Sequence, residues 1–458
     1  MSQPTGAGGI EEFGYKQELK RTLTLKDVVL YGMLFMVIIA PMSIYGEIQL
    51  ASGGLTPLVY LIGLIAISFT AMAYMHMSSR FPIAGSVYAY VQRGINPHMG
   101  FIAGWLILLD YIFIPSLLYV IVAAWGVSLI PQIPWYVWIL IFIVFNTVVN
   151  IRGIEMTKNV DWFMFIMEIG ILLFFLIIGL KYVLGGGGYG ELSVAPLYQP
   201  GKINAHFIAS ATSIACLSFL GFDGISTLAE ETIDPEKNIG KGILIAMGGI
   251  AVVFIAQTYV AALIQPDWQN INPATGFFDA AAKAGGEGFR VLLLVINILA
   301  VGVANIMAAQ TAAARMLYGM GRDGVIPKAF AKIHPKYKTP YVGTLVIGVI
   351  SCIIPLLLNL TQLVRLVNFG ALSSFILLNI AVFVFFFIKE DRRHTFGDII
   401  KYLVCPVCGI AILLFVFSGF EKLTYVIGFS WLAVGIIIGA VMSKGYKEVP
   451  DSFKNLEV

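Results

Sequence analysis

The segment Ser218-Phe-Leu-Gly-Phe-Asp-Gly224 interrupts an apolar stretch of membrane-spanning length that runs from Ser210 to Leu228. Two glycines within four residues weaken a helix, and an ionised aspartate is costly at bilayer depth. Backbone groups freed by such a break must line a cavity walled by protein, because lipid offers them no hydrogen bonds. Broken helices of this kind form binding sites in transporters, so the segment predicts a site inside a membrane protein.

The composition indicates an all-α polytopic membrane protein. Of 458 residues, 59% are hydrophobic and only 12% are charged, with a mean hydropathy of +0.87, whereas soluble proteins have about 25% charged residues. Apolar runs of about 20 residues predict about twelve transmembrane helices. The predicted spans cover residues 27–50, 55–79, 99–129, 134–150, 160–184, 206–229, 240–264, 289–317, 341–358, 363–388, 401–417 and 425–442.

The basic residues predict the orientation of these spans. If the N-terminal segment 1–26 is cytoplasmic, 23 of the 29 Lys and Arg residues lie inside, which is the bias expected of a plasma membrane protein. Segment 1–26 is polar and contains no cleavable signal, and the even span count makes the tail 443–458 cytoplasmic as well. The net charge of +3 arises from these loops and does not indicate a nucleic-acid partner.

Three further patterns argue against a metal, a cofactor or an enzyme. Cys405-Pro-Val-Cys408 has no second cysteine pair, and the five histidines lack metal-ligand spacing. The GxGxxG match at 319–324 follows an apolar helix rather than a strand, so we interpret it as a helix end. No grouping of residues suited to catalysis is present in the sequence.

A second break is expected in the first span, at Ala40-Pro-Met-Ser-Ile-Tyr-Gly46. The two breaks stand five spans apart, and because five is odd the second half inserts in the opposite orientation. This predicts two inverted repeats of five spans, at residues 27–184 and 206–388, followed by two extra helices at 401–442. The alternative is that Pro41 only kinks a continuous helix.

Several short motifs along the chain form a specific pattern when they are taken together. They are Phe81-Pro-Ile-Ala-Gly-Ser86, Gly104-Trp105, Leu109-Asp110-Tyr111, Ser218-Phe-Leu-Gly-Phe-Asp223, Glu230-Glu231-Thr232, Arg315-Met-Leu-Tyr318 and Gly321-Arg-Asp-Gly324. With them the sequence resembles the amino acid, polyamine and organocation (APC) transporter superfamily over nearly its whole length, and most of all bacterial putrescine importers. The resemblance implies a LeuT-like fold with broken spans one and six, and alternating access in which spans one, two, six and seven rock against the others.

The resemblance also implies where a small-molecule substrate lies, namely between the two breaks and beside span three. The residues that match those places are Met42, Ser43, Ile44, Tyr45, Gly46, Asp110, Tyr111, Phe219, Gly221, Phe222 and Asp223. Tyr45 and Phe222 are candidates for aromatic gates, although both may equally be interpreted as core residues.

Charge at membrane depth favours a cationic substrate. Helix halves that begin near Gly46 and Gly224 suit a carboxylate, and halves that end near Ala40 and Leu217 suit an ammonium group. A diamine has two ammonium groups and no carboxylate, so its site needs an acidic side chain at the helix ends where free amides point inward. Asp223 stands at such an end. Asp110 lies about 18 Å into its span, with no Lys or Arg at that depth. The alternatives are that Asp223 caps its helix and that Asp110 is a structural acid.

A third deep acid, Glu168, is a candidate for ion coupling. Proton-coupled relatives often carry a lysine at what resembles this place, and an acid there departs from that pattern. We therefore expect Glu168 either to carry a proton or to bind a cation such as sodium together with Gln310 and Thr311. The first hypothesis is a symporter that imports a putrescine-like amine, and the second is an amino acid permease of the same fold. A channel or receptor is disfavoured by the two breaks.

Overall fold

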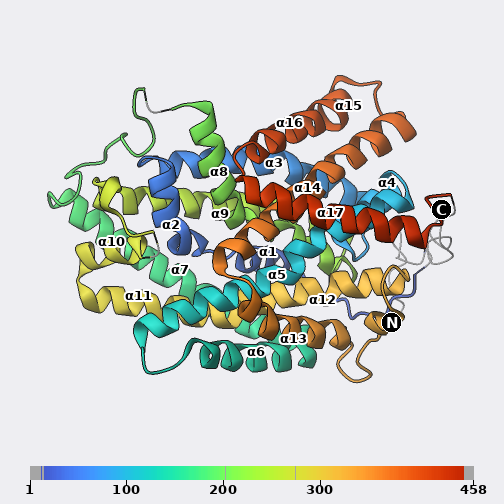
Figure 1. The fold of residues 1–458 in the computed structure, drawn as a ribbon, viewed down its shortest axis with the longest axis horizontal. Helices are drawn as coiled ribbons and strands as arrows, with labels where there is room; N and C mark the ends of the chain where they lie inside the picture. Colours follow the sequence, from blue (N-terminus) through green and yellow to red (C-terminus); the bar gives the residue numbers. More distant parts are fainter. Residues whose placement is uncertain (1–11, 13–14, 202, 274, 448–458) are drawn as a thin grey trace.

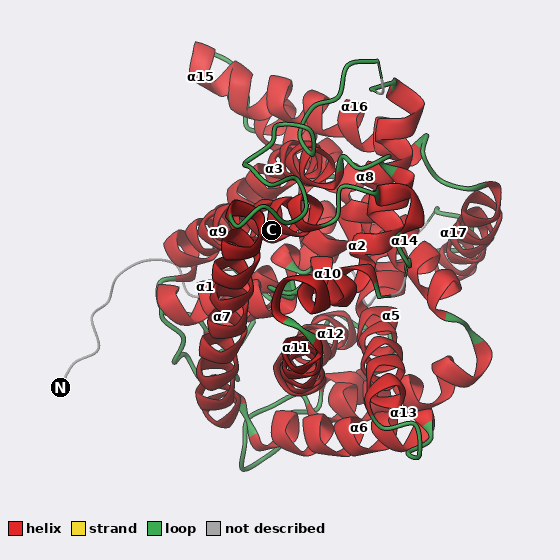
Figure 2. Ribbon diagram, turned by 90° about the vertical axis from the view of Figure 1, so that its left-hand side faces the viewer, coloured by secondary structure: helices red, strands yellow, loops and turns green. Residues whose placement is uncertain are grey.

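The computed structural model describes residues 12, 15–201, 203–273 and 275–447. This part of the chain is helical, and its only β-type pairing is an isolated bridge between Leu23 and Thr232. The helices pack around one another in a single bundle with no sheet layer (Figure 2). The prediction of an all-α polytopic membrane protein is confirmed.

Ten helical segments in the described chain are long and apolar enough to cross a membrane. Six are single helices: α3 (Thr56–Arg80), α5 (Pro97–Leu129), α6 (Trp135–Arg152), α7 (Ile154–Leu184), α9 (Pro235–Ile264) and α17 (Lys422–Met442). Four are built from joined pieces: α8 with η2 (Ala205–Phe219, Phe222–Glu231), α11 with η4 and α12 (Glu287–Ala300, Val301–Asn305, Ile306–Arg322), α14 with η6 (Leu360–Val382, Phe383–Lys389), and α15 with η7 and α16 (Phe396–Ile399, Ile400–Val404, Cys405–Phe417).

Two further elements complete the apolar set. They are the bent pair α1 (Leu25–Phe35) and α2 (Ala40–Ala51), and the shorter helix α13 (Tyr341–Leu357). Together with the ten segments they follow the predicted ranges, while the number of membrane crossings stays a prediction. Short helices connect them outside the apolar segments: α4 (Ser86–Gly94), α10 (Gly276–Gly285), η3 (Trp268–Asn270) and η5 (Lys328–Ala331).

The first break lies earlier than predicted. Helix α1 ends at Phe35, α2 begins at Ala40, and the two are bent by 42°. Pro41 stands in the first turn of α2, where its missing N–H costs no hydrogen bond, so it starts a helix instead of interrupting one. The predicted interruption at residues 40–46 was therefore wrong in position, and Met42 to Gly46 are helical.

The second break lies within the predicted segment. Helix α8 ends at Phe219 and the 3₁₀ helix η2 begins at Phe222, with Gly221 between them at a φ of 112°. A Cβ on Gly221 would stand 2.9 Å from the carbonyl carbon of Phe35, so only glycine lets the two breaks touch. The broken helices therefore meet at the centre of the bundle.

Carbonyls freed by the first break are bonded by polar side chains. Asn305 donates to the Leu34 carbonyl at 2.6 Å, and Gln257 donates to the Ile38 carbonyl at 3.0 Å. Asn305 belongs to the π-helical turn η4, and π turns often occur at functional sites. The break is thus held open by its neighbours, and the sequence did not predict this turn.

The two faces of the bundle can be told apart by its ends. The segment before α1 and the C-terminal end of α17 lie on the same side of the molecule, which we call the terminal side (Figure 1). Helices α2 and α5 end on the opposite, far side, and α8, α11, α14 and α17 begin there. A bundle in which helices alternate direction in this way suits a protein that crosses a membrane repeatedly.

Candidate functional site

A cavity of about 450 Å³ lies between the two breaks. It is lined by the first two turns of α2, by the second half of α5, by α8, and by the first turns of α11, α14 and α17, so it opens on the far side. Its walls are largely apolar, with polar groups near the rim. The lining includes Phe35, Met36, Val37, Ser43, Ile44, Glu47, Ile114, Leu117, Leu118, Trp125, Ser210, Ser213, Ile214, Leu217, Ser218, Leu220, Arg290, Arg365, Asn368 and Glu421.

Phe35 separates this cavity from a buried polar cluster. Its ring lines the cavity and contacts the ring of Tyr111 edge to face, with centroids 6.3 Å apart. A Cβ on Gly224 would stand 2.2 Å from the Phe35 ring, so the ring also lies against the start of η2. The sequence did not predict Phe35 as a site residue, because its position at the end of α1 follows only from the observed position of the break.

The buried cluster contains Asp110 and Asp223, which are 1% and 0% exposed. The Tyr111 hydroxyl donates to Asp223 Oδ2 at 2.6 Å and lies 3.2 Å from the Ser86 hydroxyl. Asp110 Oδ1 and Asp223 Oδ1 have no hydrogen-bond partner in the described chain, and the two carboxyl groups are close enough to interact electrostatically. In the part of the chain that the structure describes, no Lys or Arg side chain forms an ion pair with either of them.

Aromatic side chains wall the acids on the terminal side. Phe222 packs against Tyr74 at 5.5 Å and Phe375 at 5.4 Å between ring centroids, and Tyr74 contacts Ser86 through its hydroxyl. Asp110 and Asp223 are therefore enclosed between Phe35 on one side and Phe222 on the other. Such a cluster can bind a cation through carboxylate oxygens and aromatic faces.

Not all predicted site residues meet there. Ser43 and Ile44 line the cavity, whereas four others pack in the surrounding core: Met42, Tyr45, Gly46 and Phe219. The Tyr45 ring contacts Phe277 at 5.7 Å, and the Phe219 ring contacts Tyr60 at 6.0 Å. A Cβ on Gly46 would stand 2.3 Å from a backbone oxygen at residue 272, which makes Gly46 a close-packing position. Of the two candidate gates, only Phe222 lies beside the acids.

The three predicted coupling residues do not form one group. Gln310 donates to Thr147 at 3.0 Å and accepts from Asn150 at 2.9 Å, and Thr311 donates to Asn150 at 2.7 Å. Both side chains thus bond to α6, whereas Glu168 on α7 is completely buried and neither of its oxygens has a hydrogen-bond partner in the described chain. In the described chain no hydrogen bond joins Glu168 to Gln310 or Thr311, and the π turn that carries Asn305 stands beside Glu168, so the coupling role of these residues stays a prediction.

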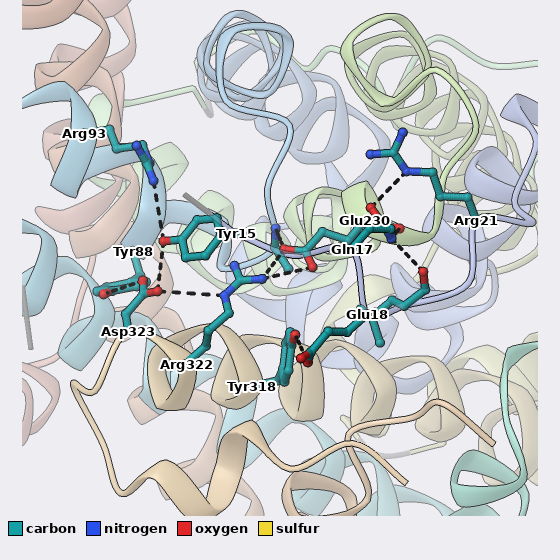
Figure 3. Close-up of polar contacts among 12 residues, drawn as sticks. Tyr15, Gln17, Glu18, Arg21, Tyr88, Arg93, Glu230, Tyr318, Arg322 and Asp323 are labelled. Atoms are coloured by element: carbon teal, nitrogen blue, oxygen red, sulfur yellow. Dashed lines mark hydrogen bonds and ion pairs between the residues drawn. The ribbon is translucent and has the colours of Figure 1, made fainter. Parts of the chain in front are cut away.

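Polar contacts close the terminal side beneath the acids (Figure 3). Arg322 at the end of α12 donates to both carboxylate oxygens of Glu230 in η2, at 2.9 and 3.1 Å. The Tyr15 ring lies 3.7 Å from the Arg322 guanidinium, and its hydroxyl donates to Asp323 at 2.9 Å. Tyr88 of α4 donates to the other oxygen of Asp323 at 2.9 Å. Burial raises the pKa of Asp323, and the nearby guanidinium and hydroxyls oppose that rise.

Additional bonds attach the segment before α1 to the same place. Gln17 donates to the backbone carbonyl of Glu230 at 2.8 Å, and Tyr318 donates to Glu18 at 3.2 Å (Figure 3). A buried ion pair between Arg315 and Glu231 lies alongside. We call the set Tyr15, Gln17, Glu18, Glu230, Arg322 and Asp323 the terminal-side closure. Arg315 and Arg322 are both neutralised here, so neither of them compensates the charge of Asp110 and Asp223.

Comparison with known proteins agrees with this geometry. The sequence profile of the amino acid permease family matches residues 30–445. The chain is 33% identical to the low-affinity putrescine importer PlaP of Escherichia coli, over 96% of this chain and 97% of that protein. It is 26% identical to the branched-chain amino acid permease BcaP of Bacillus subtilis over 95% of each chain, and 27% identical to the methylthioribose transporter of the same organism over 93% of this chain and 94% of that protein.

Proposed function

Because the chain belongs to the amino acid permease family, and is a membrane transporter rather than an enzyme, we propose that it imports a small organic amine such as putrescine. The transport is symport with protons across the plasma membrane, and both termini are cytoplasmic. The single observation that carries the choice of substrate is the buried pair Asp110 and Asp223, which no cation in the described part of the chain compensates.

The charge of this pair requires a partner. Each ionised carboxylate at membrane depth costs about 2.5 to 3.5 kcal/mol or more, and two of them close together also repel each other. A substrate ammonium group supplies the opposite charge and fills the free positions on Asp110 Oδ1 and Asp223 Oδ1. A diamine has two such groups, one for each acid.

The aromatic walls support the same substrate. Tyr111 and Phe222 are the chain neighbours of Asp110 and Asp223, and a desolvated cation over an aromatic face is stabilised by about 2 kcal/mol. Aromatic rings also contact the methylene chain of a diamine. The amide ends of α2 and η2, at Ala40 and Phe222, would favour a carboxylate, but Asp223 already brings a negative charge to the first turn of η2.

The proposed cycle follows from the two sides of the site. With the N-terminus inside, the cavity opens outward, Phe35 separates it from the acids, and the terminal-side closure blocks the way to the cytoplasm. A substrate that displaces Phe35 reaches Asp110 and Asp223, and release requires Arg322 and Glu230 to part. The contact between Gly221 and Phe35 supports an inverted repeat, 27–184 and 206–388, whose breaks meet at the site.

The second candidate is an amino acid permease. It is supported by the largely apolar cavity wall, which suits a branched side chain, and by the relative that carries branched-chain amino acids. In that case Asp110 and Asp223 hold protons for coupling and the substrate binds on the cavity side of Phe35.

Uptake into proteoliposomes tests the two candidates. Purified protein is reconstituted with radiolabelled putrescine or leucine outside, under an inward gradient of protons or of sodium. We expect accumulation of putrescine with a proton gradient and no accumulation of leucine. Accumulation of leucine that putrescine does not inhibit would instead establish the amino acid permease.

A further inference from the structure

Helix α7 carries a second pair of buried acids, away from the transport site. Asp161 and Glu168 are 7% and 0% exposed. They are seven residues apart, so they lie on one face of the helix, about 10.5 Å apart along its axis. Asp161 stands at the terminal-side end of the apolar segment Val160–Leu184, and Glu168 lies two turns deeper.

Neither acid has the partners that buried carboxylates normally have. Both oxygens of Glu168 and Oδ1 of Asp161 lack a hydrogen-bond partner in the described residues. The ion pairs found in the same residues include neither acid. Because an uncompensated buried charge is costly, these groups are suited to bind a proton and give it up again.

The deep end of the pair leads to the transport site. Asn305 stands beside Glu168 and donates to the Leu34 carbonyl at 2.6 Å. Leu34 precedes Phe35, whose ring contacts Tyr111, the donor to Asp223. Asn305 and the backbone of the first break thus lie between Glu168 and the acids of the site.

The other end leads to the terminal side. Helix α7 packs against α1, and Trp162 Nε1 lies 3.5 Å from Asp27 Oδ1 in the first turn of α1. Among the described groups, Tyr31 of α1 and Glu168 of α7 lie close enough to Asp161 to interact with it electrostatically, and Arg315 of α12, which stands near Tyr31, is neutralised by Glu231. No described Lys or Arg side chain forms an ion pair with Asp161, so we expect water at the helix end to be its exchange partner.

We propose that Glu168 binds the coupling proton and releases it along this face of α7, from Glu168 to Asp161 and then to terminal-side water. The proposal rests on the proton coupling of the proposed function. The O–H bond of protonated Glu168 breaks as an O–H bond forms on the Asp161 carboxylate, relayed by about three waters that span the gap between them. Asp161 then transfers the proton to water, and both acids return to their starting state.

Two transport modes of one protein test this path. Exchange of radiolabelled for unlabelled putrescine needs no net proton release, whereas accumulation driven by a proton gradient does. For Asp161→Asn we expect the ratio of gradient-driven uptake to exchange to fall by about tenfold or more, because the release step is removed. Asp161→Glu should restore the ratio, since it keeps the carboxyl group.

The matched control is Asp398→Asn, which changes a half-buried acid in the short helix α15, away from α7. Its ratio should equal that of the wild type. If the wild type shows proton-driven uptake and Asp161→Asn has the same ratio as the wild type, the proton path is wrong while the proton coupling still holds. If the wild type shows no proton-driven uptake, the proton coupling fails and the path fails with it.

Discussion

The Tyr111 hydroxyl donates to Asp223 Oδ2 at 2.6 Å and so joins the middle of α5 to the break in the sixth apolar segment. The bond crosses from a continuous helix to a broken one, and both side chains are buried. A bond placed there orients one oxygen of Asp223 and leaves the other free for a ligand. The position of the break therefore determines which oxygen of Asp223 can bind a ligand.

Tyr111→Phe should weaken substrate binding without unfolding the protein. A hydrogen bond to a charged group contributes about 1.5 to 3 kcal/mol, so we expect KM for putrescine to rise about tenfold or more. Tyr119→Phe, two turns along α5, removes a hydroxyl that contacts only Asn146 in the described chain and should leave KM unchanged. Equal KM values for the two variants would show that Tyr111 does not orient the site.

Asp110→Asn and Asp223→Asn should abolish uptake of the diamine while insertion into the membrane stays normal. Loss of one charge from a buried pair with an ammonium group costs about 2 to 5 kcal/mol, which corresponds to about a 30-fold or greater loss of affinity. Binding measured by isothermal titration of the detergent-solubilised protein checks this, with Asp398→Asn as the control. Unchanged putrescine affinity in both variants would refute the acidic site.

Much of the fold was predictable because it depends on apolar length. The predicted spans match the helical segments, since about 20 apolar residues are required wherever a helix crosses a bilayer. The break at Ser218–Gly224 was also predictable, because Gly221 and Gly224 mark it in the sequence. Pro41 misled the first prediction, since a proline starts a helix as readily as it interrupts one.

The site was predictable only in part. Asp110 and Asp223 were found because charge at membrane depth is visible in a sequence. Phe35 was missed because an aromatic residue in an apolar helix has no distinguishing neighbours until the break is located. The bonds of Gln310 and Thr311 to Asn150 on α6 could not be predicted, because helix rotation decides which neighbours a side chain meets. Asn305 depends on a π turn, for which the sequence has no signal.

Phe35→Ala should let substrate escape from the acids back to the cavity. The substitution removes the ring that separates the cavity from Tyr111, so we expect faster efflux of preloaded putrescine and a higher KM. Phe175→Ala removes an equally buried ring, which contacts Phe277 and Phe289 away from the cavity, and controls for lost packing. If both variants leak equally, the effect is general destabilisation and Phe35 is not a gate.

Gly221→Ala should destabilise the protein and abolish transport. The position requires a φ of 112°, and the added Cβ would stand 2.9 Å from the Phe35 backbone, so strain of about 1 to 3 kcal/mol or more is expected. Gly248→Ala in α9 adds a Cβ that meets nothing within 4 Å and should be neutral or slightly stabilising. Thermal unfolding in detergent measures both, and equal melting temperatures would contradict close contact of the breaks.

Arg322→Gln should open the terminal side. Glu230 is completely buried and accepts both of its ion-pair bonds from Arg322, so removing the guanidinium leaves a buried charge unpaired, at a cost of about 3 to 5 kcal/mol. The segment before α1 loses its contact with Arg322 at the same time, because the Tyr15 ring lies 3.7 Å from the guanidinium.

The expected result is a population shifted toward the state open on the terminal side. A cysteine at Ala84, whose amide bonds to Glu230 Oε1, should react faster with a membrane-impermeant maleimide in inside-out vesicles. Because Lys cannot donate to both oxygens in fixed geometry, Arg322→Lys should restore slow labelling only in part. Arg393→Gln breaks an exposed pair with Asp391 and should leave the rate unchanged. Labelling of Arg322→Gln at the wild-type rate would mean that these contacts stabilise the fold without closing the path.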